Sequence, residues 1–115
     1  MSERLSAGSI CWAVDPTGVH PERPVVVLSH ETHPYGATEC AVMCLGTTVS
    51  QFQHPTPPLE QHHYDGITFN KTPHLLPWAL RTIAPGSLNT NRTVGQLTAD
   101  GEQEVKKALL MLFSV

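Results

Sequence analysis

The sequence predicts a single, mainly β domain that ends in one α-helix. The chain has 115 residues, which is the size of one ordinary domain. Its ten prolines and eight glycines favour short strands joined by turns over a helical bundle. Only the last stretch, residues 98–113, has the apolar period of a helix. We therefore expect residues 1–115 to form a small twisted β-barrel closed by one terminal helix.

The first half of the chain holds three apolar runs of strand length. Residues 9–14, 24–28 and 39–46 are rich in apolar and β-branched side chains and are too short for helices. A turn signal at residues 15–18 (DPTG) separates the first two runs, since proline fixes φ and glycine tolerates a positive φ. We expect three strands here, the third of them buried.

The next part of the chain is interrupted by prolines. Residues 51–60 are proline-rich and predict an exposed loop or edge. Residues 67–69 follow an Asp-Gly turn signal and predict a short strand. Residues 75–83 are apolar but contain Pro77, which favours a bent or edge strand over a helix.

The C-terminal segment has the pattern of an amphipathic helix. Thr98 stands before it as a candidate N-cap. The apolar residues that recur at helical spacing are Val105, Ala108, Leu109, Leu112 and Phe113. This stripe predicts a helix that packs one face against the sheet.

Charge and cysteine usage restrict the function. Seven Lys and Arg against ten Asp and Glu give a net charge of −3, which excludes a scaffold that grips nucleic acid by bulk charge. A nucleic-acid site would have to be a local patch. The three cysteines form no disulfide framework, as expected in a reduced cytoplasm. Residues 1–7 lack a signal-peptide core and no apolar run could span a membrane, so we expect a cytoplasmic protein without membrane contact.

Two clusters carry candidate chemistry. Arg23 lies between a turn and a strand, where its guanidinium could hold a phosphate; the alternative is a surface arginine paired with Glu22 or another acid. Thr47, Thr48 and Ser50 follow the third predicted strand. Their hydroxyls could bind phosphate oxygens or cap the local turn.

The histidines and tryptophans are less specific. The seven histidines are His20, His30, His33, His54, His62, His63 and His74. Their spacing matches no known ligand set, so we expect neither a metal site nor a cofactor. Cys40 and Cys44 lie too far apart on one strand to share a zinc ion, and we expect both in the core. Trp12 and Trp78 suit packing, although Trp78 could also stack on a base.

Several segments match the pattern of one family in the right order. They are residues 9–12 (SICW), 15–18 (DPTG), 23–29 (RPVVVLS), 41–48 (AVMCLGTT), 81–83 (RTI) and 94–98 (VGQLT). Together they resemble the MazF/PemK/Kid toxins. The resemblance implies an SH3-like barrel that forms a homodimer, cleaves single-stranded RNA without a metal and is neutralised by a cognate antitoxin. In that chemistry the 2′-OH attacks the adjacent phosphate and gives a 2′,3′-cyclic phosphate and a 5′-OH end.

The resemblance also assigns roles to residues. It implies that Arg23 contacts the scissile phosphate, that Thr47 orients it, and that His20 serves as acid or base, with Glu22 as a reserve base. The expected RNA-binding residues are Thr48, Ser50, Glu22, Trp78 and Arg81. Residues 76–78 (LPW) stand where Kid-like members carry R-x-D, so the aspartate proposed there as a base has no counterpart.

Two other functions remain open from the sequence. A non-enzymatic, CcdB-like gyrase inhibitor would use the same fold, and the absent aspartate favours it. A histidine-rich metal-binding domain is the third hypothesis. Base preference in an RNA substrate would depend on the loops at residues 51–63 and 72–78.

Overall fold

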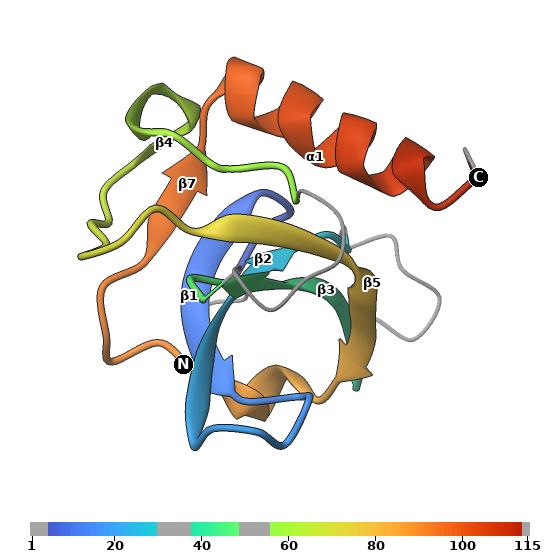
Figure 1. The fold of residues 1–115 in the computed structure, drawn as a ribbon. Coiled ribbons are helices and arrows are strands. Elements are labelled where there is room, and N and C mark those ends of the chain that lie inside the picture. Colours follow the sequence, from blue (N-terminus) through green and yellow to red (C-terminus); the bar gives the residue numbers. More distant parts are fainter. Residues whose placement is uncertain (1–4, 30–37, 49–55, 114–115) are drawn as a thin grey trace.

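The computed structural model describes residues 5–29, 38–48 and 56–113. A strongly curved antiparallel sheet forms the body, and one helix lies across one end of it (Figure 1). The strands are β1 (Ser9–Val14), β2 (Glu22–Val27), β3 (Cys40–Gly46), β4 (Tyr64–Asp65), β5 (His74–Ile83), β6 (Leu88–Asn89) and β7 (Gly95–Leu97). The helix is α1 (Ala99–Met111), and two short 3-10 turns are η1 (Gln61–His63) and η2 (Pro85–Ser87).

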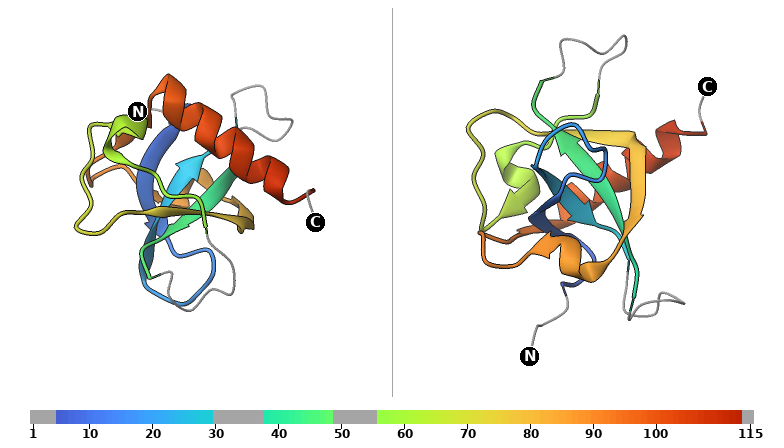
Figure 2. Two further views of the ribbon diagram at one scale, coloured as in Figure 1. Left: turned by 45° about the horizontal axis from the view of Figure 1, so that its top comes forward. Right: turned by 90° about the horizontal axis from the view of Figure 1, so that it is seen from below.

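The strands follow one open path. Their order is β4-β7-β1-β2-β3-β5, and β6 pairs with β1 beside β7. The prediction of a mainly β domain with a C-terminal helix is confirmed. The barrel is open in the part of the chain described, because β4 and β5 end the strand order without pairing with each other. The sheet still curls around its interior, as the two views in Figure 2 show.

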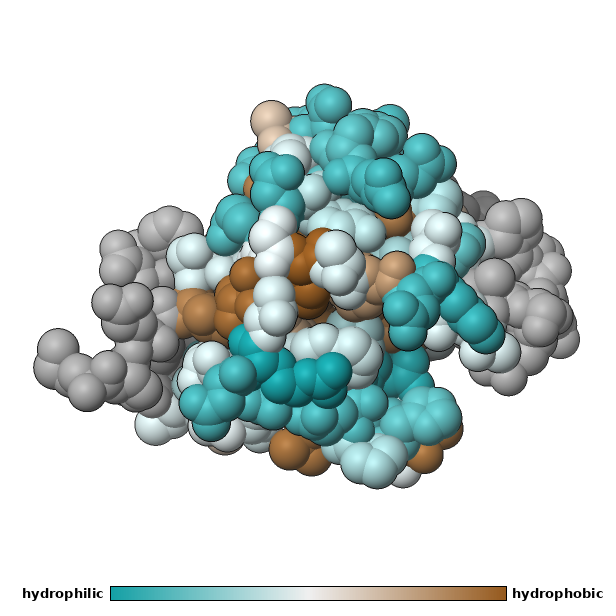
Figure 3. All heavy atoms as spheres, turned by 90° about the vertical axis from the view of Figure 1, so that its left-hand side faces the viewer, coloured by the Kyte–Doolittle hydropathy of each residue, from teal (hydrophilic) through white to brown (hydrophobic). Residues whose placement is uncertain are grey.

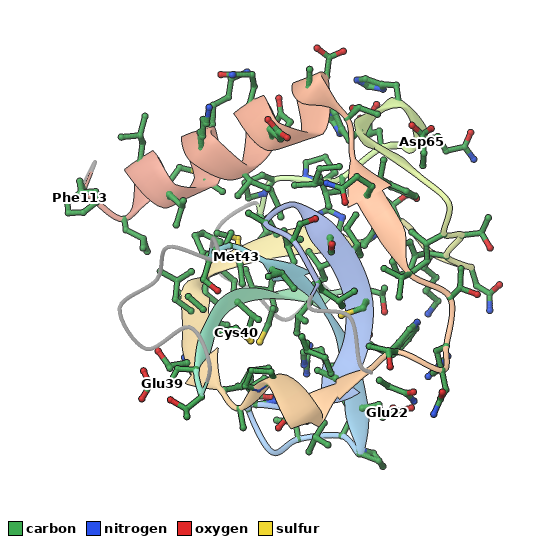
Figure 4. The ribbon with its side chains drawn as sticks, turned by 180° about the vertical axis from the view of Figure 1, so that it is seen from behind. Glu22, Glu39, Cys40, Met43, Asp65 and Phe113 are labelled. Carbon is green, nitrogen blue, oxygen red and sulfur yellow. The ribbon has the colours of Figure 1, made fainter. Side chains whose placement is uncertain are left out.

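Both faces of the central strands are buried, which explains their unbroken apolar runs. On β1, Ile10 faces one cluster and Cys11 the other. On β2, Val26 faces the first cluster while Val25 and Val27 face the second. Alternate residues of a strand point to opposite faces, so each face of these strands has its own core. Figure 4 shows side chains of β3, Cys40 and Met43 among them, inside the molecule.

The first three strands and β5 agree with the sequence prediction. The first run forms a strand over Ser9–Val14 as expected, and the other two are shifted by one or two residues at their ends. On β5, the register against β3 shifts between Met43 and Leu45, which face Leu80 and Leu75. The extra residues of β5 bulge around Pro77, which has no N–H to donate. Strand β5 is therefore bent and ends the order of named strands, as the sequence predicted for a bent or edge strand.

One prediction in the middle of the chain is wrong, and another holds in one of its two alternatives. Residues 67–69 form no strand, since Ile67 and Phe69 pack into the core without joining a ladder. Of the two alternatives for the proline-rich segment, the described part agrees with an edge and not with an exposed loop, because residues 57–59 pair with the start of β5. Leu59 is fully buried, its N–H donates to the carbonyl of Pro73 at 2.8 Å, and Pro58 bridges to His74. Residues 51–55 lie outside the described residues.

Helix α1 is fixed at its N-terminus and exposed at its end. Thr98 is the N-cap, as predicted, and its Oγ1 accepts a hydrogen bond from the Gly101 N–H at 3.2 Å. Val105 and Ala108 are buried, but Leu112 and Phe113 are exposed, which corrects the predicted stripe. Phe113 points away from the body at the far end of the helix (Figure 4). No helix among the residues described has the length and apolar character needed to cross a bilayer.

Candidate functional site

The turn between β1 and β2 is built around the carboxylate of Asp15. Oδ1 of Asp15 accepts hydrogen bonds from the Thr17 N–H at 2.8 Å and the Thr17 hydroxyl at 2.7 Å. Oδ2 accepts from the His20 N–H at 2.8 Å. Gly18, at a φ of 77°, completes the turn. An aspartate at the start of a turn commonly accepts such main-chain bonds, and here it fixes the whole segment.

The same carboxylate anchors Arg23. The Arg23 Nε donates to Oδ1 of Asp15 at 3.0 Å, and Nη1 donates to the carbonyl of Leu45 at 3.1 Å. The Arg23 side chain is 14% exposed and that of Asp15 is 0% exposed. Arg23 is thus paired with an acid, as the alternative interpretation allowed, but the acid is buried Asp15 and not Glu22. The guanidinium ties the start of β2 to the end of β3.

The electrostatics of this pair keep Asp15 charged. Burial alone would raise the pKa of Asp15, but the hydrogen bonds from Thr17, His20 and Arg23 outweigh it and hold the pKa well below its usual range. The carboxylate is therefore ionised at neutral pH. A charged acceptor with four donors around it holds the guanidinium in one orientation.

A hollow of about 660 Å³ opens beside Arg23, and we call it the Arg23 hollow. It lies between the 15–20 turn, the end of β3 and the bulged part of β5. The candidate residues that line it are His20, Glu22, Arg23, Thr47, Thr48, Trp78 and Arg81. Segments far apart in the chain therefore bring seven of the eight candidates together. The eighth, Ser50, lies outside the described residues.

The end of β3 passes beside the guanidinium at Gly46. A Cβ on Gly46 would lie 3.1 Å from Cδ1 of Leu76 and 3.6 Å from Nη1 of Arg23. Thr47 follows directly and is exposed at the mouth of the hollow. The backbone of His20 is held by Asp15 while its side chain is exposed to the same hollow. An arginine, a hydroxyl and an imidazole thus share one solvent-accessible site.

Glu22 has its own partners. Its Oε2 accepts from Nδ2 of Asn89 at 3.0 Å, and its Oε1 accepts from Nη1 of Arg92 at 2.9 Å. The bond from Asn89, followed by that from Arg92, lowers the pKa of Glu22. A carboxylate with a lowered pKa and both oxygens engaged is a poor proton acceptor, which argues against Glu22 as a reserve base. Arg92 in turn lies over the ring of Trp12, 3.9 Å from its centroid.

Among the described residues, this site has neither an exposed cysteine nor a group of metal-ligating side chains. Cys11, Cys40 and Cys44 are all buried, so the prediction that Cys40 and Cys44 belong to the core is confirmed. Burial, with a smaller contribution from Cys40, raises the pKa of Cys11 to about 12, so its thiol stays protonated. Across residues 5–29, 38–48 and 56–113, no three His, Cys, Asp or Glu side chains gather in a way that could hold a metal ion.

Sequence reasoning missed the residues that support the site. The sequence pattern indicates a turn at Asp15, although an aspartate beside an arginine-bearing strand is also a signal for an ion pair. Trp12 has the pattern of a packing residue, and no motif in the sequence marks Arg92 or Asn89. Asn89 and Arg92 contact Glu22. The pairing of β6 with β1 brings this part of the chain there, with Asn89 opposite Trp12.

Known proteins with this fold were found by structure and not by sequence. No family model matches the chain, and no curated protein sequence matches it. An endoribonuclease from a Mycobacterial species, solved in complex with its cognate antitoxin, superposes with a TM-score of 0.69 at 11% identity, over 99% of this chain and 97% of that one. A second Mycobacterial endoribonuclease superposes with a TM-score of 0.63 at 11% identity, over 100% of this chain and 96% of that one.

The chain has the fold of these endoribonucleases. The superposition covers almost the whole of each chain, so the curved sheet and the terminal helix are shared as one unit. At 11% identity the likeness extends to the fold, and function has to be argued from the Arg23 hollow itself.

Proposed function

We propose that this protein is an endoribonuclease toxin that cleaves single-stranded RNA without a metal ion. The observation that carries the proposal is the convergence of Arg23, Thr47 and His20 on one hollow, with Arg23 held by a buried carboxylate. The fold shared with two endoribonucleases supports it. The sequence resemblance to the MazF/PemK/Kid toxins points to the same activity independently.

The reaction is attack of the RNA 2′-OH on the adjacent phosphate. The oxygen–phosphorus bond to the 5′ oxygen of the next nucleotide breaks, which leaves a 2′,3′-cyclic phosphate and a 5′-OH end. Negative charge builds up on the phosphorane oxygens, and a fixed cation stabilises that charge best when it does not have to reorganise. Arg23 is such a cation because Asp15 and Leu45 hold it from two sides. The hydroxyl of Thr47 donates to a phosphate oxygen.

His20 takes the proton of the 2′-OH as the base, and the leaving oxygen takes a proton from solvent water. The 2′-OH must lose a proton and the leaving oxygen must gain one. His20 is the one histidine among the described residues that line the hollow, and its side chain is exposed there. Glu22 is poorly suited to the role because Asn89 and Arg92 occupy its two oxygens. Thr48, Trp78 and Arg81 surround the hollow as RNA-binding residues.

We further propose a homodimer in the cytoplasm that binds a cognate antitoxin. One structural neighbour was solved with its own antitoxin. Large apolar side chains are exposed at the end of α1, namely Leu110, Met111, Leu112 and Phe113. Apolar groups gathered in this way favour association with another chain. An acidic antitoxin segment in the Arg23 hollow would compete with RNA for the same cations.

RNA cleavage by the purified protein tests the proposal. A long single-stranded RNA is incubated with wild-type protein, Arg23→Ala and the surface control Lys106→Ala, each in EDTA, and the new ends are characterised. We expect cleavage with 5′-OH ends from the wild type and from Lys106→Ala, and at least a 100-fold loss in Arg23→Ala. Equal cleavage by all three proteins would contradict the assignment of Arg23. Cleavage that stops in EDTA would contradict the metal-independent mechanism.

One observation favours a second candidate, a non-enzymatic CcdB-like inhibitor. Trp78 occupies the place of the family's acidic base, and the nearby carboxylate of Glu22 is already engaged. The same preparations therefore also go into a gyrase supercoiling assay. Inhibition of gyrase by a protein that cleaves no RNA would favour the inhibitor over the nuclease.

A further inference from the structure

A second hollow adjoins the first and has no role in the chemistry described above. It has a volume of about 450 Å³, and we call it the Arg92 hollow. Trp12, Thr47 and Phe69 line both hollows, so an extended ligand such as an RNA strand can contact the two hollows continuously. Lys71 and Arg92 supply cations to the new hollow. The face with β4 and β7 is largely polar and has an apolar band across it (Figure 3).

Arg92 is held as a flat platform at this hollow. Its guanidinium carbon lies 3.9 Å from the centroid of the Trp12 ring, which covers one side of the group. Its Nη1 donates to Glu22 at 2.9 Å, and Glu22 is itself held by Asn89. The Arg92 side chain nevertheless stays 44% exposed. One side is therefore fixed against an indole while the rest remains accessible to a ligand.

The charges around the two hollows favour an anionic polymer. Four of the chain's seven lysines and arginines line them, Arg23 and Arg81 the first and Lys71 and Arg92 the second. Glu22 is the one acid among the described lining residues, and it pairs with Arg92, while the ionised Asp15 pairs with Arg23. Arg81 and Lys71 therefore carry the charges that these two acids do not match. The protein as a whole has a net charge of −3. Such a local concentration of cations on an acidic protein marks a binding surface for phosphates.

We propose that the Arg92 hollow binds the nucleotide next to the scissile phosphate, with its base stacked on the exposed side of the Arg92 guanidinium and its phosphate beside Lys71. This inference rests on the proposed ribonuclease function. Unpaired bases stack on aromatic rings and on arginine planes, whereas bases in a duplex are not accessible to such a platform. A layer of indole, guanidinium and base would select single-stranded RNA. Arg92 would then act in binding and positioning, and not on the reacting atoms.

Binding to an RNA that cannot be cleaved tests the platform without relying on catalysis. A fluorescent 2′-O-methyl oligonucleotide lacks the attacking hydroxyl, and its affinity is measured by anisotropy for wild type, Arg92→Ala, Arg92→Lys and the control Lys106→Ala. We expect Arg92→Ala to bind roughly 5- to 100-fold more weakly, the range that one stacked base provides. Arg92→Lys should restore only part of that loss, because it keeps the charge without the plane. Lys106→Ala should bind like the wild type.

An abasic scan identifies the base that stacks. Abasic residues are placed one at a time in the oligonucleotide, and the wild type should lose affinity at one position to which Arg92→Ala is insensitive. Equal affinity of Arg92→Ala and Lys106→Ala, in samples with matching thermal unfolding, would overturn the proposal. So would an Arg92→Ala protein that binds RNA normally but fails to bind an acidic antitoxin peptide. If the wild type binds this RNA as expected but cleaves no RNA, the nuclease function fails while the platform stands.

Discussion

Two ion pairs at this surface each join an arginine to a carboxylate, but they differ in how exposed their side chains are. Asp15 and Arg23 are 0% and 14% exposed, and they lie eight residues apart in the chain. Glu22 and Arg92 are 34% and 44% exposed, and they lie 70 residues apart. The first pair is enclosed by the turn and the end of β3, whereas the second rests on the outer side of Trp12.

The difference separates two tasks that an arginine can perform. A buried, multiply bonded guanidinium cannot move, so it suits the stabilisation of charge that develops at a fixed point. An exposed guanidinium on an aromatic ring keeps a free surface, so it suits the binding of a ligand by stacking. We therefore expect changes at Arg23 to act on the rate of the chemical step and changes at Arg92 to act on RNA affinity.

The largest effect is expected from Arg23→Lys. A lysine keeps the positive charge but cannot reach Asp15 and Leu45 with two nitrogens of one plane. We expect the single-turnover cleavage rate at saturating RNA to fall about 100- to 1000-fold, with little change in affinity. A rate within a factor of three of the wild type would mean that the fixed plane is unimportant.

Asp15→Asn should have the next largest effect, this time on stability. The substitution leaves the largely enclosed Arg23 without its charged partner and weakens the bonds that hold the turn. Breaking a buried pair costs about 3 kcal/mol or more, and urea unfolding followed by circular dichroism measures it. Glu22→Gln serves as the matched control at the exposed pair and should leave the free energy of unfolding nearly unchanged. Equal losses in the two variants would remove the distinction between the pairs.

The free energy of unfolding of the wild type should depend on pH through the ionisation of Asp15. The pKa of Asp15 is lower in the folded protein than its unfolded value of about 3.9, so its contribution is full above that pH and is lost as the pH falls toward the folded value. Urea unfolding is repeated from pH 6 down to pH 3. The wild type should lose stability faster than Asp15→Asn over the lower part of this range. Parallel curves would contradict a structural role for the ionised carboxylate.

The smallest effect is expected from Glu22→Gln on RNA binding. Glutamine keeps an oxygen that can accept from Arg92 but loses the charge that orients the guanidinium over Trp12. Affinity for the 2′-O-methyl oligonucleotide should fall by less than in Arg92→Ala, by roughly 2- to 5-fold. A larger loss than in Arg92→Ala would assign Glu22 a direct contact with RNA.

Local patterns predicted the parts of the fold that depend on neighbouring residues. The run at Ser9–Val14 and the Thr98 cap were recognised because strand length and capping chemistry are local properties. Residues 67–69 have the pattern of a strand, yet they join no ladder, and Ile67 and Phe69 pack into the core. Phe69 meets the ring of Tyr64 edge-on at 5.6 Å. The apolar spacing in the sequence continues to Phe113, although α1 ends at Met111 and the two residues after it are exposed.

The site was predictable in part for the same reason. Arg23 and Thr47 each stand at a strand end, a position that favours function in many folds. The carboxylate that holds Arg23 belongs to Asp15, in the same short segment. Its place in a turn motif gives no indication of this contact. The platform of Trp12 and Arg92 depends on the antiparallel register of β1 with β6, which no local pattern contains.

The location of the scissile phosphate is the most direct test of the central claim. A crystal structure of the protein with a single-stranded 2′-O-methyl RNA that spans the mapped cleavage site would provide it. We expect a phosphate oxygen within hydrogen-bond distance of the Arg23 guanidinium and of the Thr47 hydroxyl, with His20 beside the blocked 2′ oxygen. A well-ordered RNA whose cleavage-site phosphate lies away from the Arg23 hollow would contradict the account.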